Sequence, residues 1–456
     1  MLNPSIFREY DIRGIAGKDL DAGFARDLGR AYVEYAEKRL GKTGLTISVG
    51  RDCRVTGEEY SGAMMEGMIS AGAKVISLGM VTTPMTYFSL YTYEVDGAVM
   101  VTGSHNPANY NGFKMCVGKA TLHGHDIQEL LKIMQKGTAA KAGATGKPEA
   151  RDIFQAYTDF VVGNVKIGKK LKVVVDAGNG AGSTYAPEVY KKLGCEVVEL
   201  FCTPDGTFPN HPADPTVESN LQDIIKAVKE HKADCGIAFD GDADRIGVVN
   251  EKGEILWGDE LMIVLSRAVL KDHPGATIIS EVKSSYRLYN DIKEHGGNGI
   301  MWKTGHSLIK AKMKETGAKL AGEMSGHIFF ADRFFGFDDA VYAGARFLEI
   351  LANSGAPASN LLAGIPKTVN TPEIRVETDD EKKWGIVTAI KNALKEKYTT
   401  NDIDGVRVEF GDAWGLVRAS NTQPVIVMRF EAQTPERLAE VRGIIEGEAK
   451  KAGLEV

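Results

Sequence analysis

Three acidic side chains stand close together directly after an apolar run of the sequence. In IAFDGDADRIGVV, Asp240, Asp242 and Asp244 alternate with small residues, so a strand end or a tight loop would turn all three carboxylates toward one point. Two carboxylates about 4 Å apart repel by about 4 kcal/mol at an effective dielectric constant of about 20, so three require a cation or a bound proton. Oxygen ligands favour a hard divalent ion, Mg²⁺ first, and the segment therefore predicts a magnesium site.

Other interpretations of this acidic segment stay open. A solvated acidic turn is one alternative, although such turns seldom follow so apolar a strand. A calcium-binding EF-hand loop would place Glu251 at its twelfth position, but it needs glycine at the sixth, where the chain has Arg245. Arg245 could neutralise a transferring phosphoryl group or hydrogen-bond a substrate oxygen, or it could simply pair with the neighbouring aspartates.

A serine occupies a loop rich in turn-forming residues, MVTGSHNPANYNGFK, directly after the apolar run GAVMV. The glycines, asparagines and proline of this loop prevent the backbone from continuing as helix or strand, so the chain must turn sharply. We therefore expect the hydroxyl of Ser104 on a rigid, exposed corner, where it could act as a nucleophile. An ordinary surface turn is the alternative.

Two further loops carry polar groups suited to a sugar phosphate. In AGEMSGHIFF, the side chains of Glu323, Ser325 and His327 can donate and accept hydrogen bonds to neighbouring sugar hydroxyls. In VRASNTQP, an arginine, two hydroxyls, an amide and backbone N–H groups could cradle a phosphate that is held but not broken. The side chains of this second loop are Arg418, Ser420, Asn421 and Thr422. Taken alone, each loop also fits an ordinary turn.

The elements that must position these loops follow a repeated pattern. An apolar strand, a polar or glycine-rich loop, a helical stretch, a glycine and a second apolar strand occur three times, starting near residues 45, 171 and 276. This is the βαβ unit of a parallel sheet. The wide spacing of the copies favours three related α/β domains over a short-period repeat.

The pattern changes near residue 367. One helix-like segment is followed by three closely spaced strands, DGVRVEF, WGLVRAS and PVIVMRFEA, which must pair antiparallel because so few residues connect them. We therefore predict three related mixed α/β domains built on βαβ units plus a C-terminal α+β domain with an antiparallel sheet, arranged around a central cleft. The predicted domains are residues 1–149, 150–252, 253–366 and 367–456.

Composition limits what the chain can bind. A formal net charge of −6 over 456 residues gives no basic field for nucleic acid, so an anionic ligand must be bound by local groups. The five cysteines never stand in CxxC spacing, which indicates neither a disulfide framework nor a zinc site. The N-terminal residues lack the apolar segment of a signal peptide, and no apolar run is long enough for a membrane span. We expect a cytoplasmic protein, a monomer or weak dimer, with no nucleic-acid or membrane partner.

The motifs TGSHNP, DGDADR, GEMSGH and RASNT, in this order and spread over nearly the whole chain, resemble those of the α-D-phosphohexomutase family, specifically its bacterial phosphomannomutase/phosphoglucomutase branch. The segments FREYDIRG and GRDCRVTG are similar to further segments of that family. Two positions depart from the family pattern, because Gly103 stands where alanine is common and Gln423 where glutamate often follows the threonine. Neither change removes a group that performs chemistry.

The resemblance implies a phosphoserine enzyme. Ser104 would carry a phosphoryl group beside one Mg²⁺ per chain, which is held by Asp240, Asp242, Asp244 and an oxygen on that serine. Lys114 would move a proton from the attacking sugar hydroxyl, which requires a lowered pKa of its ammonium. Arg245 and His327 would assist the transfers.

The resemblance also implies the reaction and the substrate contacts. Hexose 1-phosphate and hexose 6-phosphate, of mannose and/or glucose, would interconvert through a bound hexose 1,6-bisphosphate, which is both intermediate and activator. Glu323, Ser325 and His327 would contact the sugar, and the RASNT loop the non-reacting phosphate. By the same matching, the substrate site would also include Tyr10, Arg13, Lys283 and His306.

Three other functions compete with this hypothesis. A Mg²⁺-dependent sugar-phosphate phosphatase would also form a phosphoserine, but it has no need for a second phosphate clamp. A glucosamine phosphate mutase usually carries glutamine where this chain has Met324. A non-catalytic sugar-phosphate binding protein would have no use for the aspartate triplet.

Overall fold

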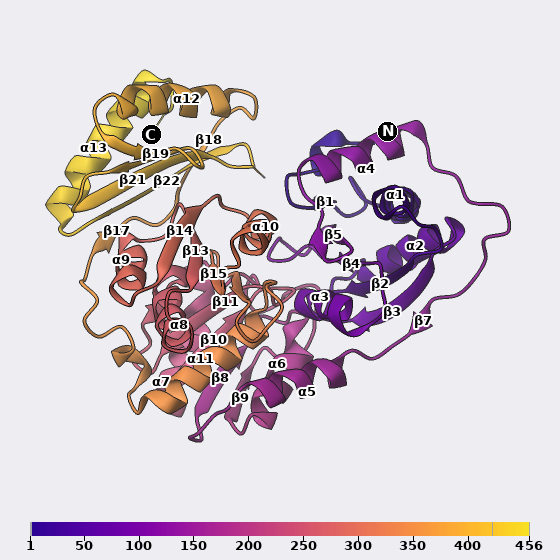
Figure 1. Ribbon diagram of the computed structural model, residues 1–456, viewed down its shortest axis with the longest axis horizontal. Helices are drawn as coiled ribbons and strands as arrows, with labels where there is room; N and C mark the ends of the chain where they lie inside the picture. The colour runs from indigo at the N-terminus through magenta and orange to yellow at the C-terminus, as the bar shows by residue number, and fades with distance from the viewer. Residues whose placement is uncertain (1, 422, 456) are drawn as a thin grey trace.

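The computed structural model describes residues 2–421 and 423–455 and contains four β-sheets in sequence order. We refer to the parts of the chain around these sheets as the first to fourth domains. In Figure 1 the first domain lies on the right, the second and third lie below and to the left, and the C-terminal fourth domain lies above the third. The predicted fold class is confirmed, whereas the exact domain boundaries stay predictions.

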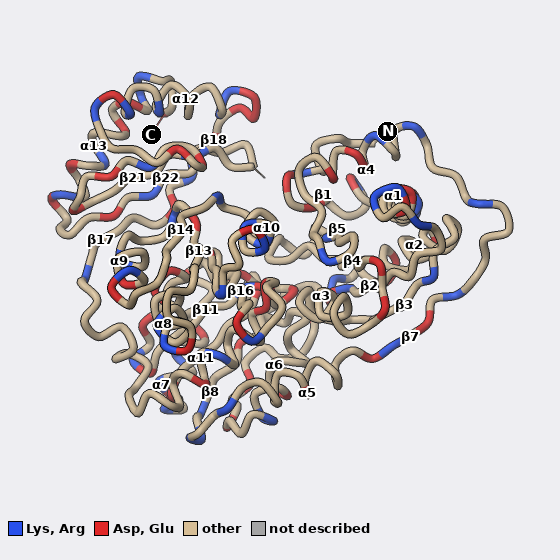
Figure 2. Tube along the Cα trace, viewed as in Figure 1, with Lys and Arg blue, Asp and Glu red and all other residues tan. Residues whose placement is uncertain are grey.

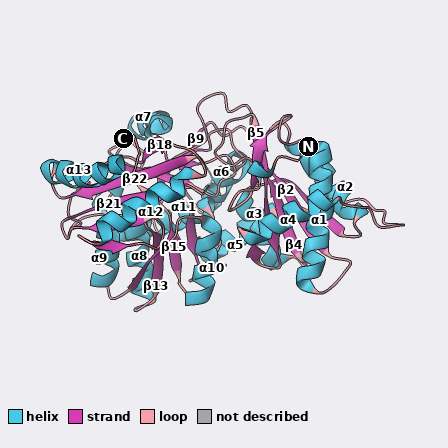
Figure 3. Cartoon of the chain, turned by 90° about the horizontal axis from the view of Figure 1, so that it is seen from above, coloured by secondary structure: helices cyan, strands magenta, loops and turns pink. Residues whose placement is uncertain are grey.

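The first domain is a mixed sheet with helices on both faces (Figure 3). Its strand order is β1-β5-β4-β2-β3-β7, and β6 pairs with β5. The strands are β1 (Ile12–Ile15), β2 (Thr46–Arg51), β3 (Lys74–Met80), β4 (Gly97–Val101), β5 (Tyr110–Val117), β6 (Ala120–Thr121) and β7 (Glu149–Ala150). The helices are η1 (Pro4–Ile6), α1 (Ala22–Leu40), α2 (Gly57–Ser70), α3 (Thr83–Thr92) and α4 (His125–Lys136).

The second domain has the strand order β12-β11-β10-β8-β9. Its strands are β8 (Lys172–Asp176), β9 (Glu196–Leu200), β10 (Cys235–Phe239), β11 (Ile246–Asn250) and β12 (Ile255–Leu256). Its helices are α5 (Phe154–Asn164), α6 (Gly182–Lys192), η2 (Glu218–Leu221) and α7 (Gln222–His231).

The third domain has the strand order β14-β13-β15-β16. Its strands are β13 (Thr277–Glu281), β14 (Asn298–Trp302), β15 (Leu320–Gly322) and β16 (Ile328–Phe330). Its helices are α8 (Gly258–Asp272), α9 (Tyr286–Glu294), α10 (His306–Thr316), α11 (Ala340–Ser354) and η3 (Ala358–Asn360).

The first three sheets repeat one topology. In each, a central strand (β2, β8 or β13) pairs in parallel with the strand that follows it through a helix, as the three predicted βαβ units require. The central strand also pairs in parallel with a third strand (β4, β10 or β15) on its other side. That third strand turns back into an antiparallel partner (β5, β11 or β16). The turn between the third and fourth strands is therefore equivalent in all three domains.

The fourth domain contains an antiparallel sheet with the order β17-β22-β21-β20-β19, in which β18 also pairs with β22. Its strands are β17 (Val369–Asn370), β18 (Ile374–Glu377), β19 (Thr399–Asn401), β20 (Val406–Glu409), β21 (Ala413–Ala419) and β22 (Val425–Ala432). Helices α12 (Lys382–Lys395) and α13 (Pro435–Lys451) cover one face of the sheet (Figure 1).

The buried apolar side chains are distributed unequally between the domains. One large core runs without interruption from α3 of the first domain through the second and third domains, and the deeply buried helix α11 forms part of it. The fourth domain has a separate core. Its buried apolar contact with the third domain is a small cluster in which Val282 meets Trp414 and Leu416. The first three domains are thus joined by apolar packing. The fourth contacts the third through this small apolar cluster and through buried polar contacts, such as those of Arg407 with the carbonyl oxygens of Val282 and Ser284.

None of the described helices combines the length and the apolar character that crossing a membrane requires.

Candidate active site

The predicted site loops occupy equivalent positions in the first three sheets. The Ser104 loop connects β4 to β5, the acidic loop connects β10 to β11, and the GEMSGH loop connects β15 to β16. Each loop therefore follows the third strand of its sheet, at the carboxyl end where ligands of α/β proteins bind. The RASNT loop of the fourth domain connects the antiparallel strands β21 and β22.

The hydroxyl of Ser104 points into the acidic loop of the second domain. Ser104 Oγ donates to Asp240 Oδ2 at 2.8 Å, and the serine backbone has a φ of 49°, which is uncommon for a residue other than glycine. The expectation of an exposed corner is wrong, because Ser104 retains only 1% of its accessible surface. The second domain covers the turn, so the hydroxyl is both fixed and shielded.

A buried arginine binds the backbone carbonyl groups of the Ser104 loop. Arg54 Nη2 donates to the carbonyl oxygens of Ser104 at 2.7 Å and Asn106 at 2.5 Å, and Arg54 Nη1 donates to those of Pro107 at 2.6 Å and Tyr110 at 2.8 Å. The guanidinium charge is balanced by the buried carboxylate of Asp52, which accepts from Arg54 Nε at 3.2 Å. Four carbonyl groups bound to one rigid guanidinium fix the shape of the loop.

Two glycines allow the loops to approach closely. A Cβ at Gly103 would lie 2.5 Å from Arg54 Cζ, so the glycine at this unusual position leaves room for the guanidinium. A Cβ at Gly241 would collide with the carbonyl oxygen of Ser104. Glycine at position 241 therefore lets the acidic loop pack directly on the Ser104 backbone.

The three aspartates form one buried cluster. One carboxylate oxygen from each of Asp240, Asp242 and Asp244 lies within 4.8 Å of the others, and all three side chains are fully buried. Lys114 Nζ donates to Asp242 Oδ2 at 2.7 Å and also to Asp244 Oδ2. Thr83 Oγ1 of α3 donates to Asp242 Oδ2 at 2.5 Å. Residues of two domains thus converge on one point.

The three carboxylates of the cluster repel one another. Burial raises the pKa of Asp240 well above its usual value, and the charges of Asp242 and Asp244 add to this effect. Among the described residues, Asp242 Oδ1 is buried without a hydrogen-bond partner. An all-oxygen set with an unused buried oxygen fits a hard divalent cation such as Mg²⁺.

Lys114 is an ammonium in this arrangement. Burial alone lowers its pKa, but the charges of Asp242, Asp244 and Asp240 outweigh burial, so that its pKa is raised above the usual value. The sequence-based expectation of a lowered pKa is therefore not met while the lysine serves as the counter-charge of the triad.

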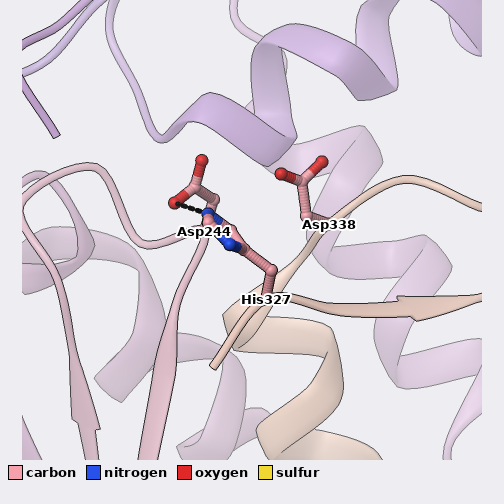
Figure 4. Close-up of side chains that lie close together, drawn as sticks. All are labelled: Asp244, His327 and Asp338. Atoms are coloured by element: carbon pink, nitrogen blue, oxygen red, sulfur yellow. Dashed lines mark ion pairs between the residues drawn. The ribbon is translucent and has the colours of Figure 1, made fainter. Parts of the chain in front are cut away.

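The GEMSGH loop contacts the acidic loop through His327. The Nε2 atom of His327 lies 3.3 Å from Asp244 Oδ1, and its Nδ1 atom lies 2.9 Å from Glu323 Oε2 and 3.0 Å from Ser325 Oγ. Burial opposes the charge of this ring, but Asp244 and Glu323 together raise the pKa of His327 to about 9. Arg245 Nε lies 3.3 Å from His327 Nε2 and 4.0 Å from Asp240 Oδ2. Figure 4 shows His327 between Asp244 and Asp338.

His306 and Tyr10 extend the site toward the fourth domain. The His306 ring lies 5.5 Å from the His327 ring and 6.0 Å from the Tyr10 ring, centroid to centroid. Tyr10 OH donates to the carbonyl oxygen of Thr304 at 2.7 Å and accepts from Asn421 Nδ2 at 2.6 Å. One phenol therefore connects the first, third and fourth domains.

Groups outside its own turn help to hold the RASNT loop. Arg418 Nε donates to Asp404 Oδ2 at 3.0 Å, and the same carboxylate oxygen accepts from the backbone N–H of Thr304 in the third domain. Lys383 Nζ donates to the carbonyl oxygen of Ser420 at 2.6 Å. The predicted residue Thr422 lies outside the described residues.

Two more predicted residues flank these loops. Lys283 Nζ donates to Glu373 Oε1 of the fourth domain at 2.6 Å and lies 3.7 Å from Glu281 Oε1. Arg13 Nη1 donates at 2.9 Å to Asn106 Oδ1 of the serine loop. Contacts thus connect loops of all four domains, and the individual roles of these residues stay predictions.

Sequence reasoning missed three residues that shape the site. They are Arg54 under the serine loop, Thr83 on the triad and Asp338, whose Oδ2 lies 3.5 Å from His306 Nδ1. Arg54 belongs to GRDCRVTG, but an arginine in a polar segment gives no sign that it is buried. Asp338 follows the aromatic segment RFFGF, which resembles ordinary core sequence.

Comparison with known proteins agrees with this geometry. Models of the phosphoglucomutase/phosphomannomutase family match in four parts, alpha/beta/alpha domain I at residues 4–141, domain II at 155–253, domain III at 257–369 and the C-terminal domain at 373–447. A phosphomannomutase/phosphoglucomutase of Pseudomonas putida is 47% identical over 97% of this chain and 95% of its own length. A phosphoglucomutase of Neisseria gonorrhoeae is also 47% identical, over 96% of this chain and 95% of its own.

A solved structure shows the same architecture. The crystal structure of a phosphoglucomutase/phosphomannomutase family protein from Burkholderia thailandensis superimposes with a TM-score of 0.92 at 44% identity and covers 99% of this chain and 98% of its own. The four family domains match in order, the relatives align over nearly the whole length, and the fold is shared. The chain therefore belongs to the phosphoglucomutase/phosphomannomutase family of mutase enzymes.

Proposed function

We propose that the chain interconverts hexose 1-phosphate and hexose 6-phosphate, of mannose and/or glucose, through a phosphoserine at Ser104 and a bound hexose 1,6-bisphosphate. The observation that carries this proposal is the 2.8 Å contact of Ser104 Oγ with Asp240 inside the buried aspartate cluster. A hydroxyl that only shaped a turn would have no reason to be buried against three carboxylates.

The proposed reaction is a pair of phosphoryl transfers. In the first, the oxygen of the free sugar hydroxyl bonds to phosphorus while the bond between phosphorus and Ser104 Oγ breaks. Lys114, as a neutral amine once a cation replaces it as counter-charge of the triad, takes the hydroxyl proton and returns it to Ser104 Oγ. In the second, the reoriented bisphosphate returns its other phosphoryl group to Ser104. Mg²⁺ held by Asp240, Asp242, Asp244 and an oxygen on the serine would supply positive charge to the phosphoryl group and replace Lys114 as counter-charge of the triad.

The remaining residues bind and orient the substrate. Glu323 and Ser325 present a carboxylate and a hydroxyl to the sugar hydroxyls, and His327 presents a charged ring N–H. Arg418, Ser420 and Asn421 hold the non-reacting phosphate in both orientations. Tyr10, Arg13, Lys283 and His306 complete the surroundings of the sugar phosphate, and Arg245 with His327 assists the proton transfers. Transfer in line then depends on positioning and charge more than on covalent chemistry of the protein.

Incubation of the purified protein with Mg²⁺ and glucose 1-phosphate tests the reaction, with ³¹P NMR as the readout. We expect glucose 6-phosphate to appear without inorganic phosphate, and we expect intact mass to show one phosphoryl group on Ser104. Ser104→Ala should lose both signals, whereas Ser219→Ala, on the exposed surface, should keep them. Release of inorganic phosphate without the isomer would establish a phosphatase instead.

Substrate preference follows from a second measurement on the same preparation. Mannose and glucose phosphates differ only at the 2-hydroxyl, so we expect comparable kcat/KM values for both 1-phosphates. Glucosamine 1-phosphate should be converted at least tenfold less efficiently. A preference for glucosamine 1-phosphate would assign the chain to the amino-sugar mutases.

A further inference from the structure

A cavity of about 410 Å³ lies between the first and third domains, where α10 packs against β6. Its volume is within the usual range of small-molecule sites. It is lined by Tyr87, Leu90, Tyr91, Cys116, Lys119 and Thr121 of the first domain. From the third domain the lining includes Lys310, Met313, Lys314, Lys319, Phe335 and Phe337. None of these residues belongs to the proposed active site.

The cavity concentrates positive charge in an acidic protein. Four lysines line it, and no lining residue in the described part of the chain is Asp or Glu. Lys310 pairs with Asp338 at 2.9 Å, whereas Lys119, Lys314 and Lys319 form no ion pair with a described residue. Figure 2 shows basic positions along α10, which carries two of the four. Converging lysines without carboxylate partners attract an anion.

The inner wall of the cavity is aromatic. Tyr87 and Phe337 are buried, and Tyr91 stacks on Phe335 with ring centroids 4.4 Å apart. The ammonium groups of Lys119 and Lys310 rest over the Tyr91 and Tyr87 rings at 4.3 and 4.2 Å. The hydroxyl of Tyr87 is buried without a hydrogen-bond partner among the described residues. A buried phenol that lacks a partner costs free energy unless a ligand supplies one.

We propose that this cavity binds a small aromatic anion, a flat ring that carries a phosphate or carboxylate group. The exposed Lys119 and Lys314 would pair with the anionic group at the mouth, and the ring would pack among the inner aromatic side chains, where the Tyr87 hydroxyl bonds to a polar ring atom. A sugar phosphate matches this wall poorly, because it has no flat apolar face.

Helix α10 connects the cavity to the proposed active site. Lys310 lies on the cavity and donates to Asp338 Oδ1, and the other oxygen of Asp338 lies 3.5 Å from Nδ1 of His306, the first residue of the same helix. Burial lowers the pKa of His306 well below its usual value, so an anion that draws Lys310 away from Asp338 would leave this buried carboxylate beside an uncharged imidazole. We therefore expect the bound anion to change the affinity of the active site for its substrate.

Isothermal titration calorimetry with adenosine 5′-monophosphate as the probe tests the site. The full-length protein should bind this nucleotide, and Lys119→Gln/Lys314→Gln should weaken binding at least tenfold. The matched control Lys18→Gln/Lys252→Gln removes two exposed lysines elsewhere and should bind as the unchanged protein does. Equal binding by both double variants, or loss of binding in Arg418→Met instead, would place the nucleotide elsewhere and overturn the proposal. Inorganic phosphate that binds as tightly as the nucleotide would overturn the role of the ring.

Steady-state kinetics tests the connection through α10. The KM for glucose 1-phosphate should change at least twofold when the nucleotide is present, and this change should vanish in Lys119→Gln/Lys314→Gln. An unchanged KM, or the same change in that variant, would overturn the connection. This measurement rests on the proposed mutase activity, whereas the calorimetry does not, so a failure of either proposal can be recognised separately.

Discussion

The Ser104 loop and the RASNT loop are held in place by different kinds of contact. The Ser104 loop is bound by Arg54 of its own domain, through four carbonyl groups, and is covered by the acidic loop of the second domain. The RASNT loop is bound by Lys383 of its own domain and also by partners across domain borders, namely Tyr10 of the first domain and, through Asp404, Thr304 of the third. The position of the Ser104 loop is therefore fixed within the first two domains. The position of the RASNT loop also depends on where the fourth domain lies.

The apolar packing shows the same difference on a larger scale. One core extends from the first domain through the second and third, although the first domain also has a second core of its own. The fourth domain takes no part in the shared core and meets the third in a small apolar cluster. A phosphoryl transfer needs its nucleophile fixed, because a displacement of about 1 Å can cost about a hundredfold in rate. The proposed clamp must admit a sugar phosphate, and a domain outside the shared core can move without opening that core.

Removal of the divalent ion should have the largest effect and should affect only one of the two loops. After dialysis against EDTA we expect kcat to fall by about 10³-fold or more, because three buried carboxylates would then face the phosphoryl group without a divalent cation and Lys114 would stay protonated among them. Mg²⁺ should restore it. Binding of glucose 1-phosphate by calorimetry should change only about threefold, since the clamp holds the phosphate. Full activity in EDTA would contradict the assignment of the triad.

Arg54→Met tests the rigidity of the Ser104 loop. We expect kcat to fall by about 10²-fold as the serine loses its position, and the free energy of unfolding to fall by about 3–5 kcal/mol because Asp52 is left buried and unpaired. Asp52→Asn/Arg54→Met should recover part of the stability but not the rate. The control Arg51→Met removes a surface ion pair with Glu58 and should cost less than about 1 kcal/mol. Normal kcat in a folded Arg54→Met protein would contradict the anchoring role.

Arg418→Met tests the clamp. We expect KM for glucose 1-phosphate to rise by about 10- to 100-fold while kcat changes only about threefold, because in the proposed function the arginine would hold the non-reacting phosphate in the ground state and the transition state alike. Arg442→Met, which removes an exposed arginine of α13, is the matched control and should leave both constants unchanged. A fall in kcat with unchanged KM would mean that the two loops act as one rigid unit.

Glu373→Gln tests the polar attachment of the fourth domain and should have the smallest effect. Lys283 lowers the pKa of Glu373 from 4.5 to about 2, so their ion pair stabilises the folded protein above about pH 4.5 and loses this contribution as the pH falls toward 2. Glu373→Gln should therefore be less stable than the unchanged protein at about pH 6. This difference in the free energy of unfolding should shrink by on the order of 1–2 kcal/mol when the pH is lowered to about 3. Urea unfolding at the two pH values checks this. Glu377→Gln, an exposed change on β18, should show no such difference.

The sequence predicted the helices and strands but not all of the contacts between them. The three βαβ units and the antiparallel C-terminal strands were predictable because apolar periodicity and short connections limit the pairing of strands. The buried position of Ser104 was not, because it depends on a loop about 136 residues away in the chain that closes over the serine. Arg54 was missed for the same reason. Its four partners are backbone carbonyl groups, which every residue has, so the residue types in the loop do not reveal them.

The order of apolar strands, helices and polar loops along the chain determined by itself which sheets form and that each presents one polar loop at the end of a strand. Only the tertiary structure decided which charges meet. It placed the ammonium of Lys114 among the aspartates and so raised its pKa, and it set His327 between Asp244 and Glu323. The reason is physical: backbone patterns act over a few neighbouring residues, whereas electrostatic energy depends on distance and burial, which the packing of whole domains sets.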